Sequence, residues 1–325
     1  MLRRRAILQG LAASSVPLAL DSSRAEATYP NKPITVIVPA AAGGGSDTCA
    51  RAVAEKMRQA LDTPVIVDNR AGATGDIGLR AVGSAAPDGY MLCNVSAANT
   101  ANEAARPDKA YSVTGNLRPV GKVGISAFTL VVAPSLGVKT VEDFIGYAKA
   151  RPGKLCYGSV GPGSSQHLVM EMFCAAAGMQ MTHVAYRGEI KAVPDLIEGN
   201  IHAMFMAGAK PFVSSGKVLG LATTNRTTWP SMPELRPIGD SEALKGFHYN
   251  GWNGLMVPVK TPDAIVRKLS SALVAALRDE PTITALRTAS YEPGKGTPED
   301  LADHIRAEVI NFKRIIAERR LTFPD

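Results

Sequence analysis

"PAAAGGGSD", residues 39–47, places three consecutive glycines between an apolar run and an amphipathic one. The preceding "ITVIVPA" is β-branched and predicts a strand, and the following "SDTCARAVAEKMRQAL" has apolar side chains on one helical face. Consecutive glycines lose much backbone entropy on folding, which a chain tolerates where it bends sharply or closely approaches another group. The stretch therefore predicts a strand-to-helix turn that serves either tight turning alone or the approach of a ligand.

The alternation of strand and helix patterns continues outward from this turn. A first βαβαβ series is completed by "PVIVDNR", "GDIGLRAVGSA" and "YMLCNVS". A second series begins at "FTLVVAPSL" and continues through "KLCYGSV", "SSQHLVMEMFCAAAG", "MTHVAYRG", "IHAMFMA" and "VLGLATT". Continuous apolar strands between helices predict parallel sheets covered on both faces, so the fold class is α/β with two similar lobes.

Two helices near the C-terminus have clear predicted starts. Thr261-Pro262 and Thr297-Pro298 each offer an N-cap hydroxyl followed by proline at the first helical position. We expect this C-terminal helical pair to pack back on the first lobe.

The composition excludes several classes of protein. The 325 residues are 46% hydrophobic, which suits a globular protein of about two domains. The formal net charge of +7 is spread along the chain, so a nucleic-acid partner is not supported. The five histidines lack metal-ligand spacing, and small core residues are favoured over disulfides for the four cysteines, Cys49, Cys93, Cys156 and Cys174.

The N-terminus has the pattern of a cleaved export signal. Arg3, Arg4 and Arg5 precede an apolar stretch at residues 6–20, and the small residues Ala25 and Ala27 follow as a cleavage site. The stretch is too short for a lasting membrane span. Residues 1–27 are therefore predicted to be a cleaved export signal, used by either the twin-arginine or the general secretory route.

A second glycine-rich turn is found in the second series. "YGSVGPGSSQH", residues 157–167, also runs from a strand through glycines into a helix. Both turns deliver small hydroxylated residues and free N–H groups at a helix N-terminus, where partial positive charge favours an anion. Two such turns facing each other would hold a small acid.

Other motifs fit these turns less well. Neither turn has the lysine of a P-loop, the spacing of a dinucleotide fingerprint or the G-x-S-x-G of a nucleophile elbow. Ser164 or Ser165 with His167 would make a hydrolytic pair, but this spacing at a helix start is more typical of capping.

A third candidate is "HVAYRGE", residues 183–189, at the end of a second-lobe strand. Ligands of open α/β sheets collect at such strand ends. Tyr186 is either a wall of the cleft or an ordinary loop residue, and Arg187 is expected to be a solvated loop charge.

The ordered motifs "YPNKPITVIVPAAAGGGSD", "VDNRAGATGDIG", "AAPDGYML", "YGSVGPGSSQHL", "HVAYRG" and "PGKGTPED" resemble the solute-binding receptors of tripartite tricarboxylate transporters, the Bug proteins. The resemblance covers nearly the whole chain after the signal. It implies a type II-like periplasmic binding protein of two Rossmann-like α/β lobes joined by two crossing strands, with the ligand between them. Residues 28–125 with 250–325 would form lobe 1, and residues 126–249 would form lobe 2.

The resemblance also implies which residues bind the solute. Backbone amides and hydroxyls of the two turns would take its carboxylate, with no cofactor or metal. The expected ligand-binding residues are Ala40, Ala42, Gly44, Gly45, Ser46, Asp47, Ser159, Gly163, Ser164, Ser165, Tyr186 and Met206.

The sequence departs from the family pattern near this site. An aromatic residue and prolines are usual where Ala40, Ala41 and Ala42 stand, and an aspartate is usual at Met206. Glu189 and Lys191 replace small neutral residues. These departures favour a roomier, less polar cleft and an acid bulkier or more apolar than citrate.

The sequence is therefore interpreted as a binding module rather than an enzyme. We expect a periplasmic monomer that captures a small organic acid and passes it to transporter membrane subunits. Two alternatives remain open: a receptor of the same fold that feeds a sensor kinase, and an exported serine hydrolase.

Overall fold

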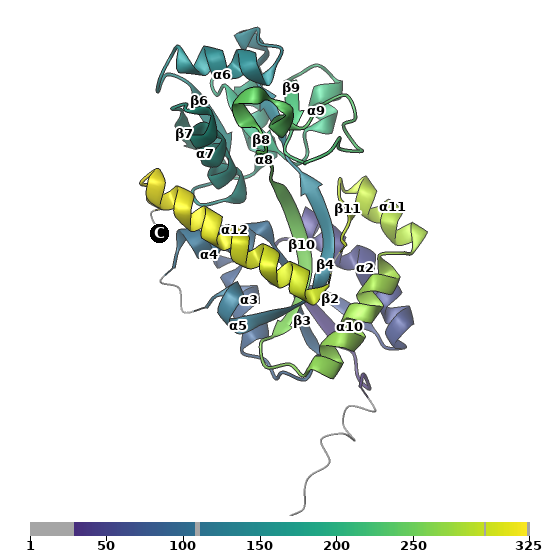
Figure 1. The fold of residues 1–325 in the computed structure, drawn as a ribbon. Coiled ribbons are helices and arrows are strands. Elements are labelled where there is room, and N and C mark those ends of the chain that lie inside the picture. Colours follow the sequence, from purple (N-terminus) through teal and green to yellow (C-terminus); the bar gives the residue numbers. More distant parts are fainter. Residues whose placement is uncertain (1–28, 108–110, 296, 324–325) are drawn as a thin grey trace, which may run out of the picture.

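The computed structural model describes residues 29–107, 111–295 and 297–323, and these form two β-sheets covered by helices (Figure 1). The predicted export signal lies outside the described residues. The first sheet contains, in spatial order, β11 (Glu292–Pro293), β4 (Leu117–Ala127), β10 (Asn250–Pro258), β3 (Met91–Ser96), β1 (Ile34–Val38) and β2 (Val65–Asn69). The second contains β7 (Thr182–Ala185), β6 (Cys156–Ser159), β8 (Ala203–Met206), β5 (Thr129–Val132) and β9 (Leu219–Thr223). The predicted α/β fold with two lobes is confirmed.

The helices of the described residues alternate with these strands. The first lobe carries α2 (Gly45–Leu61), α3 (Asp76–Gly83), α4 (Ala97–Ala105), α5 (Val113–Asn116), α10 (Asp263–Ala276), α11 (Glu280–Thr288) and α12 (Pro298–Glu318). The second carries α6 (Val141–Lys149), α7 (Ser165–Ala177), α8 (Glu189–Glu198) and α9 (Lys210–Ser214). Short 3₁₀ turns are η1 (Ala73–Gly75), η2 (Pro134–Leu136), η3 (Ile238–Asp240) and η4 (Glu242–Leu244). None of the helices in the described ranges is long and apolar enough to cross a membrane.

The prediction of parallel sheets is only partly right. The β1 strand pairs in parallel with β2 and β3, and β6 does so with β7 and β8. The β10 strand, however, is antiparallel to both β3 and β4, and β5 is antiparallel to β8 and β9. The reason is the crossing of the chain: Phe128 alone separates β4 from β5, and β10 later returns in the opposite direction (Figure 1). The two sheets are therefore mixed, and two antiparallel strands join the lobes.

Local sequence accounts for most of the helix ends. The Thr297 side chain accepts a hydrogen bond from the Asp300 N–H and forms a capping box with that residue, so the predicted start of α12 is confirmed. The prediction for α10 is wrong, because Pro262 is its N-cap and the Thr261 hydroxyl has no hydrogen-bond partner among the described residues. The Thr261 N–H instead donates to the Pro258 carbonyl at 3.0 Å, which holds this residue in the preceding turn.

The C-terminal helices pack on the first lobe, and α12 also contacts the second. Helix α10 packs on α2, and α12 packs on α4 and β4, so the predicted return to the first lobe is confirmed. Helix α12 also reaches the second lobe, where the Arg319 guanidinium donates to Glu171 of α7 at 2.8 Å. One buried apolar cluster runs through Leu79, Trp252 and Phe173 and thus spans both lobes.

The four cysteines are small packing residues, as predicted. All four lie within the described ranges and none forms a disulfide. Cys49, Cys93 and Cys174 are buried, and burial raises the pKa of each thiol.

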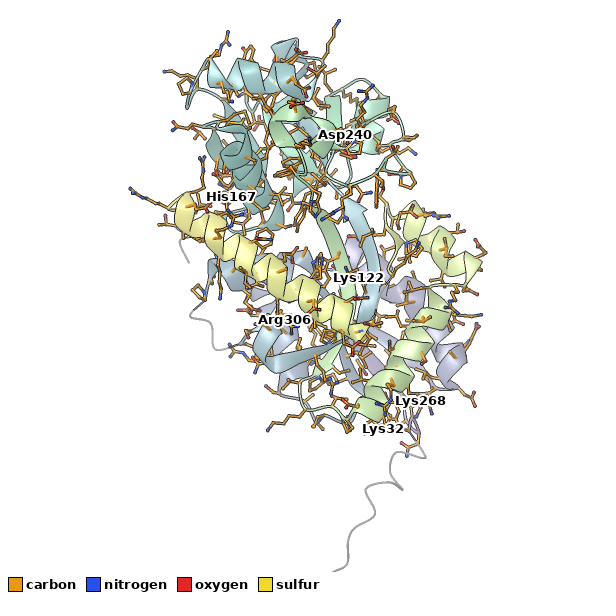
Figure 2. All side chains as sticks on the ribbon, in the orientation of Figure 1. Lys32, Lys122, His167, Asp240, Lys268 and Arg306 are labelled. Atoms are coloured by element: carbon orange, nitrogen blue, oxygen red, sulfur yellow. The ribbon has the colours of Figure 1, made fainter. Side chains whose placement is uncertain are left out.

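A buried carboxyl group lies where α12 contacts the hinge strands. Glu308 Oε2 accepts hydrogen bonds from Thr100 Oγ1 at 2.5 Å and from Trp252 Nε1 at 3.0 Å. Burial raises the pKa of Glu308 to about 7, although the hydrogen bonds from Thr100 and Trp252 and the charge of Lys122 act in the other direction. Lys122 lies beside α12 on the hinge strand β4 (Figure 2).

We predict that Glu308 makes the free energy of unfolding fall as pH rises. Between the ordinary carboxyl pKa of 4.5 and about 7, the folded state binds more protons than the unfolded state, so stability is lost through this window. Relative to a Glu308→Gln variant, the wild type should lose about 3 kcal/mol between about pH 4 and about pH 8. Urea titrations followed by circular dichroism at several pH values measure this difference.

Glu318→Gln is the matched control, because Glu318 lies on the same helix and is exposed. Its stability relative to the wild type should not change across the same pH range. A pH profile of Glu308→Gln that runs parallel to the wild-type profile contradicts the prediction.

Candidate functional site

The first glycine-rich turn joins β1 to α2, and its backbone conformation and a close contact explain two of its glycines. Gly43 has a φ of +79°, Gly44 is the N-cap, and α2 begins at Gly45. A Cβ atom on Gly45 would lie 2.6 Å from the Tyr291 hydroxyl oxygen, so the tyrosine would have to move for a side chain to fit. The group that closely approaches this turn in the structure is the Tyr291 side chain.

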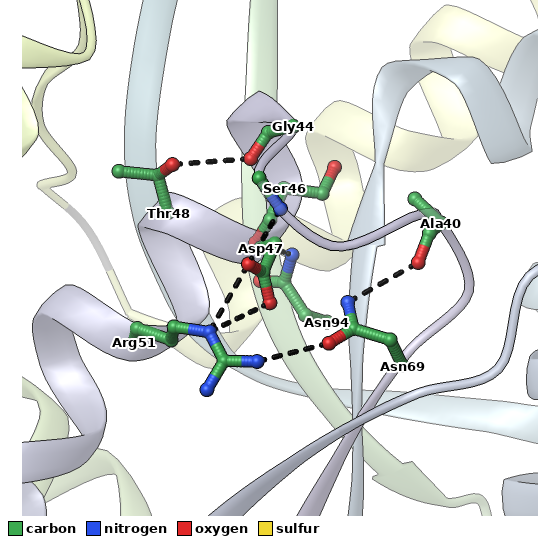
Figure 3. Close-up of polar contacts among 9 residues, drawn as sticks. Ala40, Gly44, Ser46, Asp47, Thr48, Arg51, Asn69 and Asn94 are labelled. Carbon is green, nitrogen blue, oxygen red and sulfur yellow. Dashed lines mark hydrogen bonds and ion pairs between the residues drawn. The ribbon is translucent and has the colours of Figure 1, made fainter.

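Asp47 braces this turn from within (Figure 3). Its Oδ2 accepts hydrogen bonds from the Gly43 N–H at 2.9 Å and from Arg51 Nε at 3.0 Å. Arg51 also donates to Asn69 Oδ1 at 2.9 Å, and Asn69 Nδ2 donates to the Ala40 carbonyl at 3.2 Å. Burial acts to raise the pKa of Asp47, but the bonds from Arg51 and Gly43 hold it below its usual value. Its carboxylate therefore belongs to the framework of the turn.

The turn itself is open to solvent. Ala42, Gly44 and Gly45 are exposed, and Ser46 is half-buried. The first N–H groups of any α-helix lack acceptors within the helix, so those at the start of α2 are free to meet an anion. The Ser46 carbonyl is held from below by Asn94 Nδ2 at 3.0 Å, and the same amide donates to Asn253 Oδ1 of the hinge strand β10 at 3.0 Å.

The second glycine-rich turn follows β6 and is fixed by a serine and a histidine. Ser159 Oγ lies 2.7 Å from His183 Nε2 and accepts from the Gly161 N–H at 3.1 Å. Ser159 has no exposed surface, so its hydroxyl orders the turn rather than meeting solvent.

Ser164 and His167 form a cap at the start of α7, as the sequence favoured. Ser164 Oγ accepts from the His167 N–H, and His167 Nδ1 accepts from the Gly163 N–H at 3.0 Å. The imidazole of His167 stacks on that of His183 with ring centroids 3.9 Å apart. Burial lowers the pKa of His167 to about 3, and His183 adds to the effect. The ring is therefore neutral, and its Nδ1 is occupied by the turn.

The second turn also contacts the first lobe. A Cβ atom on Gly163, whose φ is +74°, would lie 2.8 Å from the Ala105 side chain at the end of α4. Ser165 is buried and has Tyr249 among its polar neighbours, next to the return strand β10. These contacts bring the start of α7 against the hinge.

The remaining expected site residues belong to the second lobe. The Tyr186 hydroxyl donates to Asp195 Oδ2 of α8 at 2.6 Å, and its ring lies over Gly158. Met206 ends β8 and is fully buried in an apolar cluster, so its side chain is a packing group of the second lobe. Arg187 is exposed, as expected for a loop charge.

Glu189 has a role that the sequence did not reveal. Its Oε1 accepts from Gln166 Nε2 at 2.9 Å and from the Ala207 N–H at 3.0 Å, and its Oε2 accepts from the Gly208 N–H at 3.2 Å. Its charge also helps to raise the pKa of Tyr291, which burial raises most. The Glu189 carboxylate therefore joins the second glycine turn, through Gln166, to the backbone that follows β8.

Three contributors to this region were missed by sequence reasoning. They are Asn94 of β3, Asn253 of the hinge strand β10, and Tyr291, which lies between α11 and β11. Tyr291 stands just before the motif "PGKGTPED", but no local pattern connects it with residue 45.

A separate cavity of about 1010 Å³ lies on the α12 side of the hinge strands. Its lining includes Lys122, Trp229, His248 and Glu308. None of the expected ligand-binding residues lines it, so this cavity is distinct from the region of the two turns.

Comparison with known proteins identifies the family of the chain. The model of the tripartite tricarboxylate transporter family receptors matches residues 49–321. Protein BugT of Bordetella pertussis is 32% identical over 298 residues, which cover 90% of this chain and 90% of that protein.

Two solved structures are similar over nearly their whole length. An R. palustris protein solved with adipate is 30% identical with a TM-score of 0.76, covering 89% of this chain and 97% of its own. A Rhodopseudomonas palustris protein solved with bound malate is 26% identical with a TM-score of 0.74, covering 89% of this chain and 100% of its own. The chain described here belongs to the tripartite tricarboxylate transporter receptor family, whose members include the Bug proteins.

Proposed function

We propose that the protein is a periplasmic solute-binding receptor that captures a small organic carboxylate and delivers it to a tripartite tricarboxylate-type transporter. Residues 28–125 with 250–325 would form one lobe and residues 126–249 the other, and hinge closure would enclose the ligand. The observation that carries the proposal is the turn at the start of α2, in which Gly44 and Gly45 are exposed and Asp47 bonds to the Gly43 N–H.

This turn has the properties of an anion site. The N-terminus of the 17-residue helix α2 carries partial positive charge and N–H groups that lack helical acceptors. Family relatives of similar length were solved with adipate and with malate, which are both carboxylates. Together these observations support a carboxylate as the ligand and the first turn as one of its contacts.

The serines and histidines of the second turn support a receptor rather than a hydrolase. Ser164 accepts from the His167 main chain, and the His167 Nδ1 atom accepts from Gly163. The pair Ser159 and His183 is closer, but Ser159 is fully buried and also bonded to Gly161. Each of these groups has a structural partner, which favours binding without bond cleavage.

We predict that freshly purified protein retains a small acid. Native mass spectrometry should show a bound species, and denaturation should release an unmodified organic carboxylate. A thermal shift with adipate and malate tests the same proposal on ligand-free protein, because a ligand that binds only the folded state raises its melting temperature. Absence of both a retained acid and any shift with carboxylates, or chemical turnover of the acid, contradicts the proposed function.

A substitution at Gly45 tests the first turn. In Gly45→Ala the new methyl group would meet the Tyr291 hydroxyl oxygen at 2.6 Å and disturb the start of α2. Binding of the retained acid should weaken by about 1–3 kcal/mol, as for the loss of one or two charge-assisted hydrogen bonds. Isothermal titration calorimetry measures this change.

Gly146→Ala is the control, because a Cβ atom there meets nothing within 4 Å and the residue lies inside α6. Its affinity should equal that of the wild type. In the double variant Gly45→Ala/Tyr291→Phe, removal of the hydroxyl should restore part of the lost affinity. If Gly45→Ala binds the acid with wild-type affinity, the turn connects β1 to α2 but does not bind the ligand.

A further inference from the structure

In the second lobe, backbone amides and a side-chain amide bind a carboxylate of the chain itself, that of Glu189. Glu189 is the first residue of α8, and its side chain reaches the backbone after β8. It accepts hydrogen bonds from the N–H groups of Ala207 and Gly208 at 3.0 and 3.2 Å, and from the Gln166 amide at 2.9 Å. Two backbone amides and a side-chain amide are donors of the kind that can bind the carboxylate of an acid.

The charge of Glu189 is not matched by a cation. Among the ion pairs formed within the described residues, none includes Glu189. Its three donors are neutral groups, so its negative charge acts on whatever occupies the region beside it. In the first lobe, by contrast, the buried Asp47 carboxylate is paired with Arg51 at 3.0 Å.

Glu189 lies beside the second glycine turn, because it accepts a hydrogen bond from Gln166 of that turn at 2.9 Å. Its charge also adds to the rise in the pKa of Tyr291 that burial mainly causes, and the Tyr291 hydroxyl approaches Gly45 of the first turn. A solute that spans the two turns would therefore meet N–H donors at one end and a carboxylate at the other. A second carboxylate on the solute would be repelled at the Glu189 end, whereas an ammonium group would be attracted.

We infer that this receptor selects acids with one carboxylate and a distal ammonium group over dicarboxylates, and that Glu189 determines this selectivity. The inference rests on the proposed function and names its substrate class. The carboxylate of the solute binds at the first turn, and the ammonium group pairs with Glu189. The glutamate side chain thus takes the place that the second carboxylate of a diacid would need.

Length-matched pairs of acids test the selectivity in the unmodified protein. The pairs are succinate and 4-aminobutanoate, glutarate and 5-aminopentanoate, and adipate and 6-aminohexanoate, measured by isothermal titration calorimetry on ligand-free protein. Each pair differs only in the group at one end. In the pair that binds best, the amino acid should bind at least 10-fold more tightly than the diacid.

Two substitutions assign the selectivity to Glu189. Glu189→Gln keeps the size of the side chain and one acceptor but removes the charge, so the preference should fall at least 10-fold. Glu189→Ala frees the N–H groups of Ala207 and Gly208, so the affinity for the diacid should rise at least 10-fold. Glu198→Gln is the control: it removes one charge from the exposed end of the same helix and should keep the wild-type preference.

Three results overturn the inference. They are equal or tighter binding of the diacid by the wild type, an equal loss of preference in Glu198→Gln and Glu189→Gln, and no binding of any of the six acids. A retained acid in the native mass spectrum separates failure of this inference from failure of the proposed function. A retained dicarboxylate would support the proposed receptor function and contradict the inferred preference for an ammonium group.

Discussion

The return strand β10 is the constraint on which the rest of the structure depends. It lies between β3 and β4 and is antiparallel to both. Because β10 and β4 are the two strands that cross between the lobes, their pairing forms the hinge. Neighbouring side chains of a strand point to opposite faces, and this strand uses both. Asn253 bonds to Asn94 beneath the first glycine turn, while Trp252 bonds to Glu308 of α12. A single strand therefore supports the candidate site on one side and the bracing helix on the other.

The carboxylates of the two lobes have different partners: Asp47 of the first lobe is paired with a cation, whereas Glu189 of the second is bonded to neutral amides. The negative charge near the candidate site is therefore unevenly distributed between the lobes. Asp47 is buried, paired with Arg51 and bonded to the turn that it supports. Glu189 is half-buried and bonded to neutral amides. The first turn can therefore present helix N–H groups to an anion without interference from its own acid. The second lobe presents a negative charge beside amides that are already occupied.

The sequence was informative where a property is local. Apolar periodicity predicted the strands and helices, the glycines predicted both strand-to-helix turns, and the spacing of Ser164 and His167 predicted a cap. Strand direction was not predictable, because the apolar pattern of β10 is the same whichever way it pairs. The contact of Gly45 with Tyr291 was equally hidden, since it depends on two segments far apart in the chain. Glu189 stood out only as an unusual residue, because its donors come from α7 and from the turn after β8.

The contact of Tyr291 with Gly45 also sets an order of events during synthesis. The glycine turn is among the first parts of the domain to leave the ribosome, whereas its covering tyrosine is among the last. Until residues 291–319 have been added, the turn lacks its contact with Tyr291 and α12 cannot bridge the lobes. A nascent chain shorter than this therefore carries the candidate turn without the contacts that fix its surroundings.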